Sequence, residues 1–297
     1  MTKYIKITLL TLLFATNAQA KTDTIEFIYN PGDQKFTKEI ESSKKSIEDG
    51  VLSIDHKEYT ALSITTKKTS TGWRLIEKND KSLLINKEPE KNPFKKLLED
   101  AVITYHIDSN GALRNIEGFD AINKKIMRSL PPGMPKSMMD KMDMRKFKEN
   151  EWKKQIESFS GKTYEINKAS LSKESFNLPS GAIINYDVVT TVHKSNECPS
   201  QPCVLIKQEY KSKKNKRKSE SESESESDFI RGIIKDNPNQ IPEVTSSNFT
   251  LTGKSERTLN PQTMLTYYQK SEKSIMIETA MGQRGVTEKR SVKFNYN

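Results

Sequence analysis

The stretch AVITYHIDSNGALRNI, residues 101–116, says more about the fold class of this chain than any other. Apolar residues recur at every second position over 101–107 and again towards 116, as they do in half-buried β-strands. Between the two runs lie residues 108–111 (DSNG), and an Asn-Gly pair favours the positive backbone dihedral angles of a tight turn. The stretch therefore predicts a β-hairpin.

The same period of two recurs along most of the chain. Ile25, Phe27 and Tyr29 share one face of a predicted strand over 24–29. Two further runs predict the arms of a second hairpin, over 183–192 and 203–210. The other predicted strands cover residues 51–54, 59–66, 73–77, 248–251, 264–269, 274–278 and 292–296.

Two helices interrupt these strands. Phe119, Ile122, Ile126 and Leu130 are spaced by three and four residues, which predicts an amphipathic helix that ends before Pro131. A second helix is predicted over 135–159, with Gly161 as a stop signal. Strands, a helical pair and more strands predict an α+β, β-rich fold. We expect a curved, mostly antiparallel sheet or half-barrel covered by a helical segment.

Residues 1–20 have the pattern of a secretory signal peptide. Lys3 and Lys6 precede an apolar run, ITLLTLLFA, and Ala18-Gln19-Ala20 supplies a small-x-small cleavage site. The run is about half of the roughly 20 residues that a membrane-spanning helix needs. The sequence therefore predicts cleavage after Ala20 and a periplasmic or secreted protein without a transmembrane anchor.

The rest of the chain divides into three predicted parts. Residues 21–210 form a β-rich domain with the helical insert at about 119–159. Residues 211–228 (KSKKNKRKSESESESESD) contain no apolar side chain, so they predict a disordered charged loop. Residues 229–297 supply C-terminal strands that we expect to complete the same sheet.

The chain has two cysteines, Cys198 and Cys203. In an exported protein so close a pair predicts a disulfide, here at the tip of a hairpin. A redox-active pair is the alternative, but that chemistry usually uses C-x-x-C at the start of a helix. Pro199 and Pro202 argue against a helix here, so we favour a structural bridge.

No motif for catalysis, metal binding or cofactor binding is present. The three histidines, His56, His106 and His193, are not spaced as metal ligands, and there is no G-x-S-x-G elbow or glycine-rich phosphate loop. We therefore predict no catalytic residues, no metal site and no cofactor, hence a protein that is not an enzyme. A cluster of His106 or His193 with a carboxylate in a cleft would reverse that prediction.

The chain is basic, with 49 Lys and Arg against 39 Asp and Glu and a formal net charge of +10. Such a surplus favours anionic partners. Export makes nucleic acid an unexpected partner, which leaves lipid headgroups and acidic glycans. One functional hypothesis is therefore a cell-envelope structural or interaction module with a basic surface that binds anionic glycans or membrane.

Methionine is unusually concentrated, since six of the ten methionines lie within residues 127–144. Met134, Met138 and Met142 recur at every fourth position and Met139 adjoins them. Methionine adapts to irregular apolar partners. The favoured hypothesis is that these residues hold an apolar or amphipathic ligand, a lipid or lipidated peptide, under a Met-rich helix. Two alternatives stay open: core packing against the sheet, and a Cu(I) site, which the interleaved lysines disfavour.

The hairpin over 102–116, followed by Glu117-Gly118 and a helix from Phe119, resembles a block in exported bacterial proteins. There a strand, an Asn-Gly turn, a strand, a glycine and a helix precede a Pro-rich segment. That resemblance implies no particular activity. Many strands with covering helices after a signal peptide are also similar to the half-barrels of lipoprotein carriers and lipid-binding periplasmic proteins. This second resemblance implies an open sheet that holds a lipid.

Overall fold

The computed structural model describes residues 22–48, 51–84, 101–129, 143–177, 183–212, 248–279 and 282–296. Several predictions fall outside these ranges. They are the signal peptide with its cleavage site, all of the charged loop beyond Ser212, and the site residues Met134, Met138, Met139 and Met142.

Eleven strands form one antiparallel sheet in the order β6-β5-β4-β3-β2-β13-β12-β11-β10-β9-β8. Their bounds are β2 Gln34–Glu48, β3 Val51–Thr69, β4 Gly72–Leu84, β5 Val102–Asp108, β6 Leu113–Glu117, β8 Ala169–Asn177, β9 Ile183–Lys194, β10 Val204–Ser212, β11 Asn248–Leu259, β12 Thr266–Thr279 and β13 Gly282–Tyr296. A small second sheet pairs β1 (Thr24–Glu26) with β7 (Thr163–Glu165). The C-terminal strands β11 to β13 lie in the middle of the large sheet, between β10 and β2.

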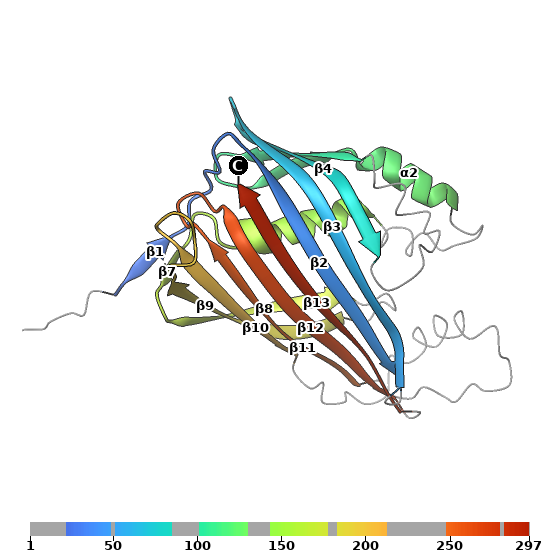
Figure 1. Ribbon diagram of the computed structural model, residues 1–297. Helices are drawn as coiled ribbons and strands as arrows, with labels where there is room; N and C mark the ends of the chain where they lie inside the picture. The colour runs from blue at the N-terminus through green and yellow to red at the C-terminus, as the bar shows by residue number, and fades with distance from the viewer. Residues whose placement is uncertain are drawn as a thin grey trace, which may run out of the picture.

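The large sheet is strongly curved and open, with β6 and β8 as its two edges (Figure 1). Helix α2 covers Phe119–Ser129, and helix α4, Met144–Trp152, continues into a π-helical turn, η1, over Lys153–Glu157. Side chains of α4 and η1 contact β4, β13 and β8, and the backbone carbonyl of Gln155 in η1 contacts β11, so this helix crosses the concave side of the sheet. The sheet-dominated α+β class is therefore confirmed. Within the described ranges, no helix has both the length and the apolar character needed to cross a bilayer.

The hairpin predicted over 101–116 is confirmed as β5 and β6. The carboxylate of Asp108 closes its turn by accepting hydrogen bonds from the backbone N–H groups of Asn110 and Ala112, both at 2.9 Å. The first predicted helix is also confirmed, as α2. The second predicted helix is present from Met144 onward, and its earlier part lies outside the described residues.

The disulfide is confirmed as well. Cys198 and Cys203 are joined by a bond of 2.00 Å between β9 and β10, and both residues are buried. These two strands pair antiparallel, as the predicted hairpin requires. Disulfides persist mainly outside the cytosol, so the bridge is consistent with a periplasmic or extracellular protein.

Other strand predictions were wrong in extent. The predicted strand over 24–29 ends at Glu26, because Phe27 N–H and Ile28 N–H bond to the loop carbonyls of Lys162 and Pro261 instead of a neighbouring strand. The runs at 51–54 and 59–66 belong to a single strand, β3. The runs at 264–269 and 274–278 also belong to a single strand, β12, which begins only at Thr266. Two long strands, β2 and β8, were not predicted.

The turn of the β5–β6 hairpin also anchors the helix on the concave side. Trp152 donates its indole N–H to the carbonyl oxygen of Gly111 at 2.9 Å, and its ring stacks on Tyr105. Glu157 accepts a hydrogen bond from the backbone N–H of Leu113 at 2.8 Å. These contacts hold the junction of α4 and η1 at one end of the sheet.

We predict that Gly111→Ala destabilises the fold more than Gly161→Ala. Both glycines have positive φ angles, +87° and +72°, which costs an alanine about 1–3 kcal/mol at either site. At Gly111 the new methyl would also lie 2.8 Å from Cβ of Tyr29, whereas nothing lies within 4 Å at Gly161. Urea unfolding of both variants measures the difference. Equal losses would show that the Tyr29 contact at the turn is unimportant.

Candidate ligand-binding site

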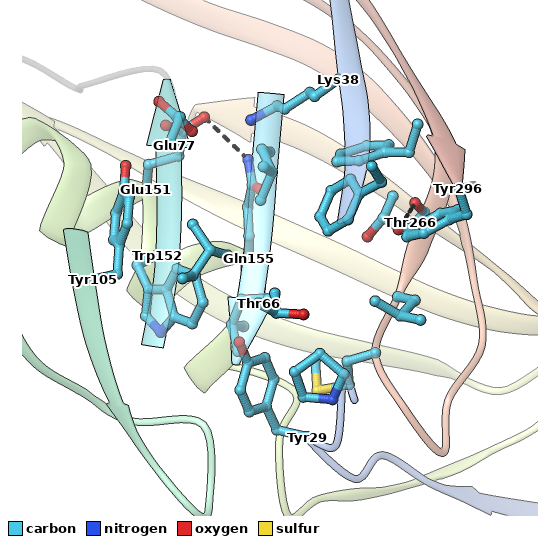
Figure 2. Close-up of a pocket in the computed structure, with 18 of the residues that line it drawn as sticks. Tyr29, Lys38, Thr66, Glu77, Tyr105, Glu151, Trp152, Gln155, Thr266 and Tyr296 are labelled. Atoms are coloured by element: carbon cyan, nitrogen blue, oxygen red, sulfur yellow. Dashed lines mark hydrogen bonds between the residues drawn. The ribbon is translucent and has the colours of Figure 1, made fainter. Parts of the chain in front are cut away.

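A cavity of about 120 Å³ lies between the concave face of the sheet and α4–η1 (Figure 2). Its sheet wall is largely apolar and comes from six strands; it includes Phe36 of β2, Ile64 of β3, Leu75 of β4, Tyr105 of β5, Thr266 of β12 and Phe294 of β13. The helix contributes Trp152 and Ile156, and the loops at one end contribute Tyr29 and Met264. We call this space the concave cavity.

Strand alternation places these side chains together. Phe36 of β2 is opposite Ile64 of β3 and Tyr296 of β13, so the three lie on the same side of the sheet. The next inward position of β2 is Lys38, which is opposite Leu62 and Phe294. A lysine thus occupies a position that its neighbours fill with apolar side chains.

The size of the concave cavity limits what it can hold in this conformation. Protein interiors rarely contain voids much larger than a water molecule. An apolar cavity of about 150 Å³ can bind benzene. The concave cavity therefore accepts a small apolar group as it stands, and a long acyl chain requires the helix to shift or the chain to extend beyond it.

Charged side chains gather on one side of the concave cavity. We call Lys38, Glu77, Lys148, Glu151 and Arg290 the charged cluster. Lys148 Nζ lies 3.8 Å from Glu77 and 3.4 Å from Glu151, and Arg290 Nη1 lies 3.1 Å from Glu151. Figure 2 shows Lys38, Glu77 and Glu151 on the same side, opposite Tyr29 and Trp152.

The charges in this cluster depend on one another. Burial opposes the ionisation of Glu151, but Lys148, Lys38 and Arg290 outweigh it and hold the pKa of Glu151 at about 2. Burial likewise disfavours the charged form of Lys148, but Glu77 and Glu151 outweigh that cost and raise its pKa. Both groups are therefore charged at neutral pH.

Lys38 differs from Lys148. Burial lowers the pKa of Lys38, Lys148 and Arg290 add to that effect, and Glu77 and Glu151 offset it only in part. Among the described residues no carboxylate lies within 4.0 Å of its ammonium group. Its Nζ lies over the ring of Phe294, 5.8 Å from the centroid.

The phenols of the cavity are neutral. Burial raises the pKa of Tyr29, Tyr105 and Tyr296 above the ordinary value for tyrosine. Tyr296 donates its hydroxyl hydrogen to the carbonyl oxygen of Thr266 at 2.7 Å. These side chains add aromatic surface to the cavity without adding charge.

On the other side of η1, two cations bind the helix to the sheet. Arg257 of β11 donates to the carbonyl oxygen of Gln155 at 2.5 Å and lies over the ring of Phe159. Burial lowers the pKa of Arg257 to about 10. Lys154 contacts Glu174 and the hydroxyl of Tyr186, each at 3.0 Å. The C-terminal end of the helix is therefore firmly held.

The structure brings together few of the residues that the sequence singled out as a site. Met134, Met138, Met139 and Met142 lie outside the described residues. Met264 lines the concave cavity instead, from the loop before β12; the sequence had placed it in a predicted strand over 264–269 and not in a site. Cys198 and Cys203 do not line it. Trp152 and Ile156 do, and their helical spacing was the signal in the sequence that placed them on one face.

The histidines with described side chains lie away from the cavity. His106 Nε2 is 3.0 Å from Glu117 on the partly exposed β5–β6 hairpin, and His193 Nδ1 is 2.6 Å from the side-chain oxygen of Asn167. Across the part of the chain that the structure describes, no three His, Cys, Asp or Glu side chains are grouped so as to hold a metal ion.

We predict that Glu151→Gln reduces the pH dependence of stability in acid. Glu151 takes up a proton near pH 4.5 when unfolded but only near pH 2 when folded. Its charge therefore stabilises the fold above pH 4.5, by about 3 kcal/mol, and this contribution is lost as the pH falls towards 2. The variant should be less stable at neutral pH and lose less stability over that interval.

Urea unfolding at a series of pH values measures this effect. Glu149→Gln, on the same helix but outside the charged cluster, is the matched control. If the two variants have the same pH profile, the charged cluster does not determine the ionisation of Glu151.

No protein-family model matches the sequence, and no curated protein is significantly similar to it. Among solved structures, the fold is similar to a chain described under "Lipid-protein interactions in lipovitellin", with a TM-score of 0.43 and 9% sequence identity. The match covers 89% of this chain and 25% of the lipovitellin chain, so this protein spans about a quarter of that length. A match of this strength does not establish a common fold.

Proposed function

We propose that this protein is an exported, non-catalytic binding protein for an apolar or amphipathic ligand, a lipid or a lipidated peptide. The ligand's apolar part lies in the concave cavity, between the sheet and α4–η1. The observation that carries this proposal is the unfilled apolar space of about 120 Å³ beneath the helix.

The composition of the chain supports the same reading. Hydrophobic residues make up only 33% of the sequence, yet aromatic and aliphatic side chains from five strands and the helix converge on one space that they do not fill. Closing such a void would bury more apolar surface and stabilise the free protein. A ligand that enters the void provides the same contacts, so the unfilled state favours binding.

The way the helix is attached suits a ligand longer than the cavity. Its C-terminal end is held by Trp152, Glu157 and Arg257. Its N-terminal end is joined to α2 by polar contacts, Asn123 to Asp143 at 3.0 Å and Arg145 to the exposed carboxylate of Asp120. Exposed ion pairs contribute little stability, so the pair between Arg145 and Asp120 opposes a movement of this end only weakly.

The predicted methionine site remains part of the proposal. In sequence, Met142 immediately precedes Asp143, the N-cap of α4. We propose that Met134, Met138, Met139 and Met142 contact a bound ligand. Binding by the triple variant with Met134, Met138 and Met142 replaced by glutamine tests their part.

We predict that Leu75→Trp abolishes the binding of an apolar probe. Leu75 lines the cavity from β4, and an indole there would occupy the space that the probe needs. The probe is N-phenyl-1-naphthylamine, a neutral dye that fluoresces in apolar surroundings. A titration followed by fluorescence gives the dissociation constant for each protein.

Leu171→Trp is the matched control, since Leu171 lies on the edge strand β8 with 65% of its surface exposed. We expect unchanged binding by this variant and at least a tenfold loss for Leu75→Trp. If the probe binds both variants as it binds the unaltered protein, or does not bind the unaltered protein, the concave cavity is not the ligand site.

A further inference from the structure

We propose that the ligand carries a single anionic group and that Lys38 of β2 binds this group. The inference rests on the proposed function, because it identifies the polar end of the ligand whose apolar end fills the concave cavity. The class of ligand is then an anionic amphiphile, either a fatty acid or a lipid with a phosphodiester headgroup.

The first observation is the position of Lys38. It points to the same side of the sheet as Phe36 and Ile40, between them on β2, and is flanked by Phe294 and Leu62 on the neighbouring strands. A lysine in the middle of an apolar wall costs stability unless something compensates its charge. Figure 2 shows its ammonium group directed towards Glu77 and Glu151.

The second observation is the charge balance around it. Glu77 and Glu151 are already engaged by Lys148, and Glu151 also by Arg290. When Lys38 is protonated, the charged cluster contains three cations and two carboxylates, which leaves one positive charge in excess. Within the described ranges, no carboxylate lies close enough to pair with Lys38. An anion with one negative charge would neutralise the cluster.

The third observation is the gradient along β2. Phe36 is only 5% exposed, Lys38 is partly buried, and Lys44, farther along the same face, is exposed. Lys38 therefore lies between the apolar cavity and the more exposed end of the strand. An amphiphile bound with its chain against Phe36 and its headgroup at Lys38 keeps its charge at that boundary.

The test compares four ligands that share a ten-carbon chain and differ in their headgroup: decanoate, decyl methyl phosphate, decanol and decyltrimethylammonium. Isothermal titration calorimetry of the full chain lacking only residues 1–20 gives their affinities. We expect decanoate or the phosphate diester, or both, to bind at least tenfold more tightly than decanol, and the cation more weakly. Which anion binds more tightly identifies the headgroup.

Lys38→Met keeps the length and apolar stem of the side chain and removes the charge. We expect this variant to bind decanoate no more tightly than decanol, with its affinity for decanol unchanged. Lys35→Met, on the opposite, exposed face of the same strand, removes an equal charge and should keep the preference for anions. The comparison of ligands on the unaltered protein does not depend on either variant folding.

The outcomes separate the two proposals. If decanol binds and neither anion binds more tightly, the headgroup assignment is wrong while the apolar site stands. A preference for anions that survives in Lys38→Met also overturns the role of Lys38. If none of the four ligands binds, the proposed function itself fails.

Discussion

The attachment of Trp152 to the β5–β6 turn is the contact on which the site depends. Its indole N–H reaches the carbonyl oxygen of Gly111, and its ring packs between Tyr105 and Tyr29. This contact requires a glycine, because a side chain at residue 111 would collide with Tyr29. The turn thus holds the helix over the curved sheet and leaves the space beneath it unfilled.

The second constraint is electrostatic. A helix that carries Lys148 and Glu151 into a partly buried space must find partners for both. Glu77 of β4 and Arg290 of β13 supply them from the sheet. The two charged groups of the helix are therefore fixed to the sheet on the polar side of the cavity, while Trp152 and Ile156 face its apolar side. The helix therefore contributes side chains to both the apolar and the charged side of the cavity.

The sequence predicted those parts whose patterns are local. The Asn-Gly turn identified β5 and β6, the spacing of Phe119 and Ile122 identified α2, and the cysteines with their flanking strands identified the β9–β10 hairpin. It failed at β2, because Lys38 occupies an inward position between Phe36 and Ile40 and breaks the alternation that marks a half-buried strand. Lys38, which obscured this strand in the sequence, is also the residue that we propose binds the ligand.

The convergence of Glu77, Glu151 and Arg290, distant in sequence, could not be predicted because only strand pairing and helix packing bring them together.

The place of the C-terminal strands in the sheet has a consequence for how the chain acquires its structure. Strand β2 pairs with β13, and Asn295 donates a hydrogen bond to Glu39 across a sequence separation of 256 residues. The centre of the sheet therefore cannot form until the last strand is available, however early the first hairpins appear. Contacts so distant in sequence slow folding. A chain synthesised only as far as β12 therefore lacks the strand that joins β2 to the other half of the sheet.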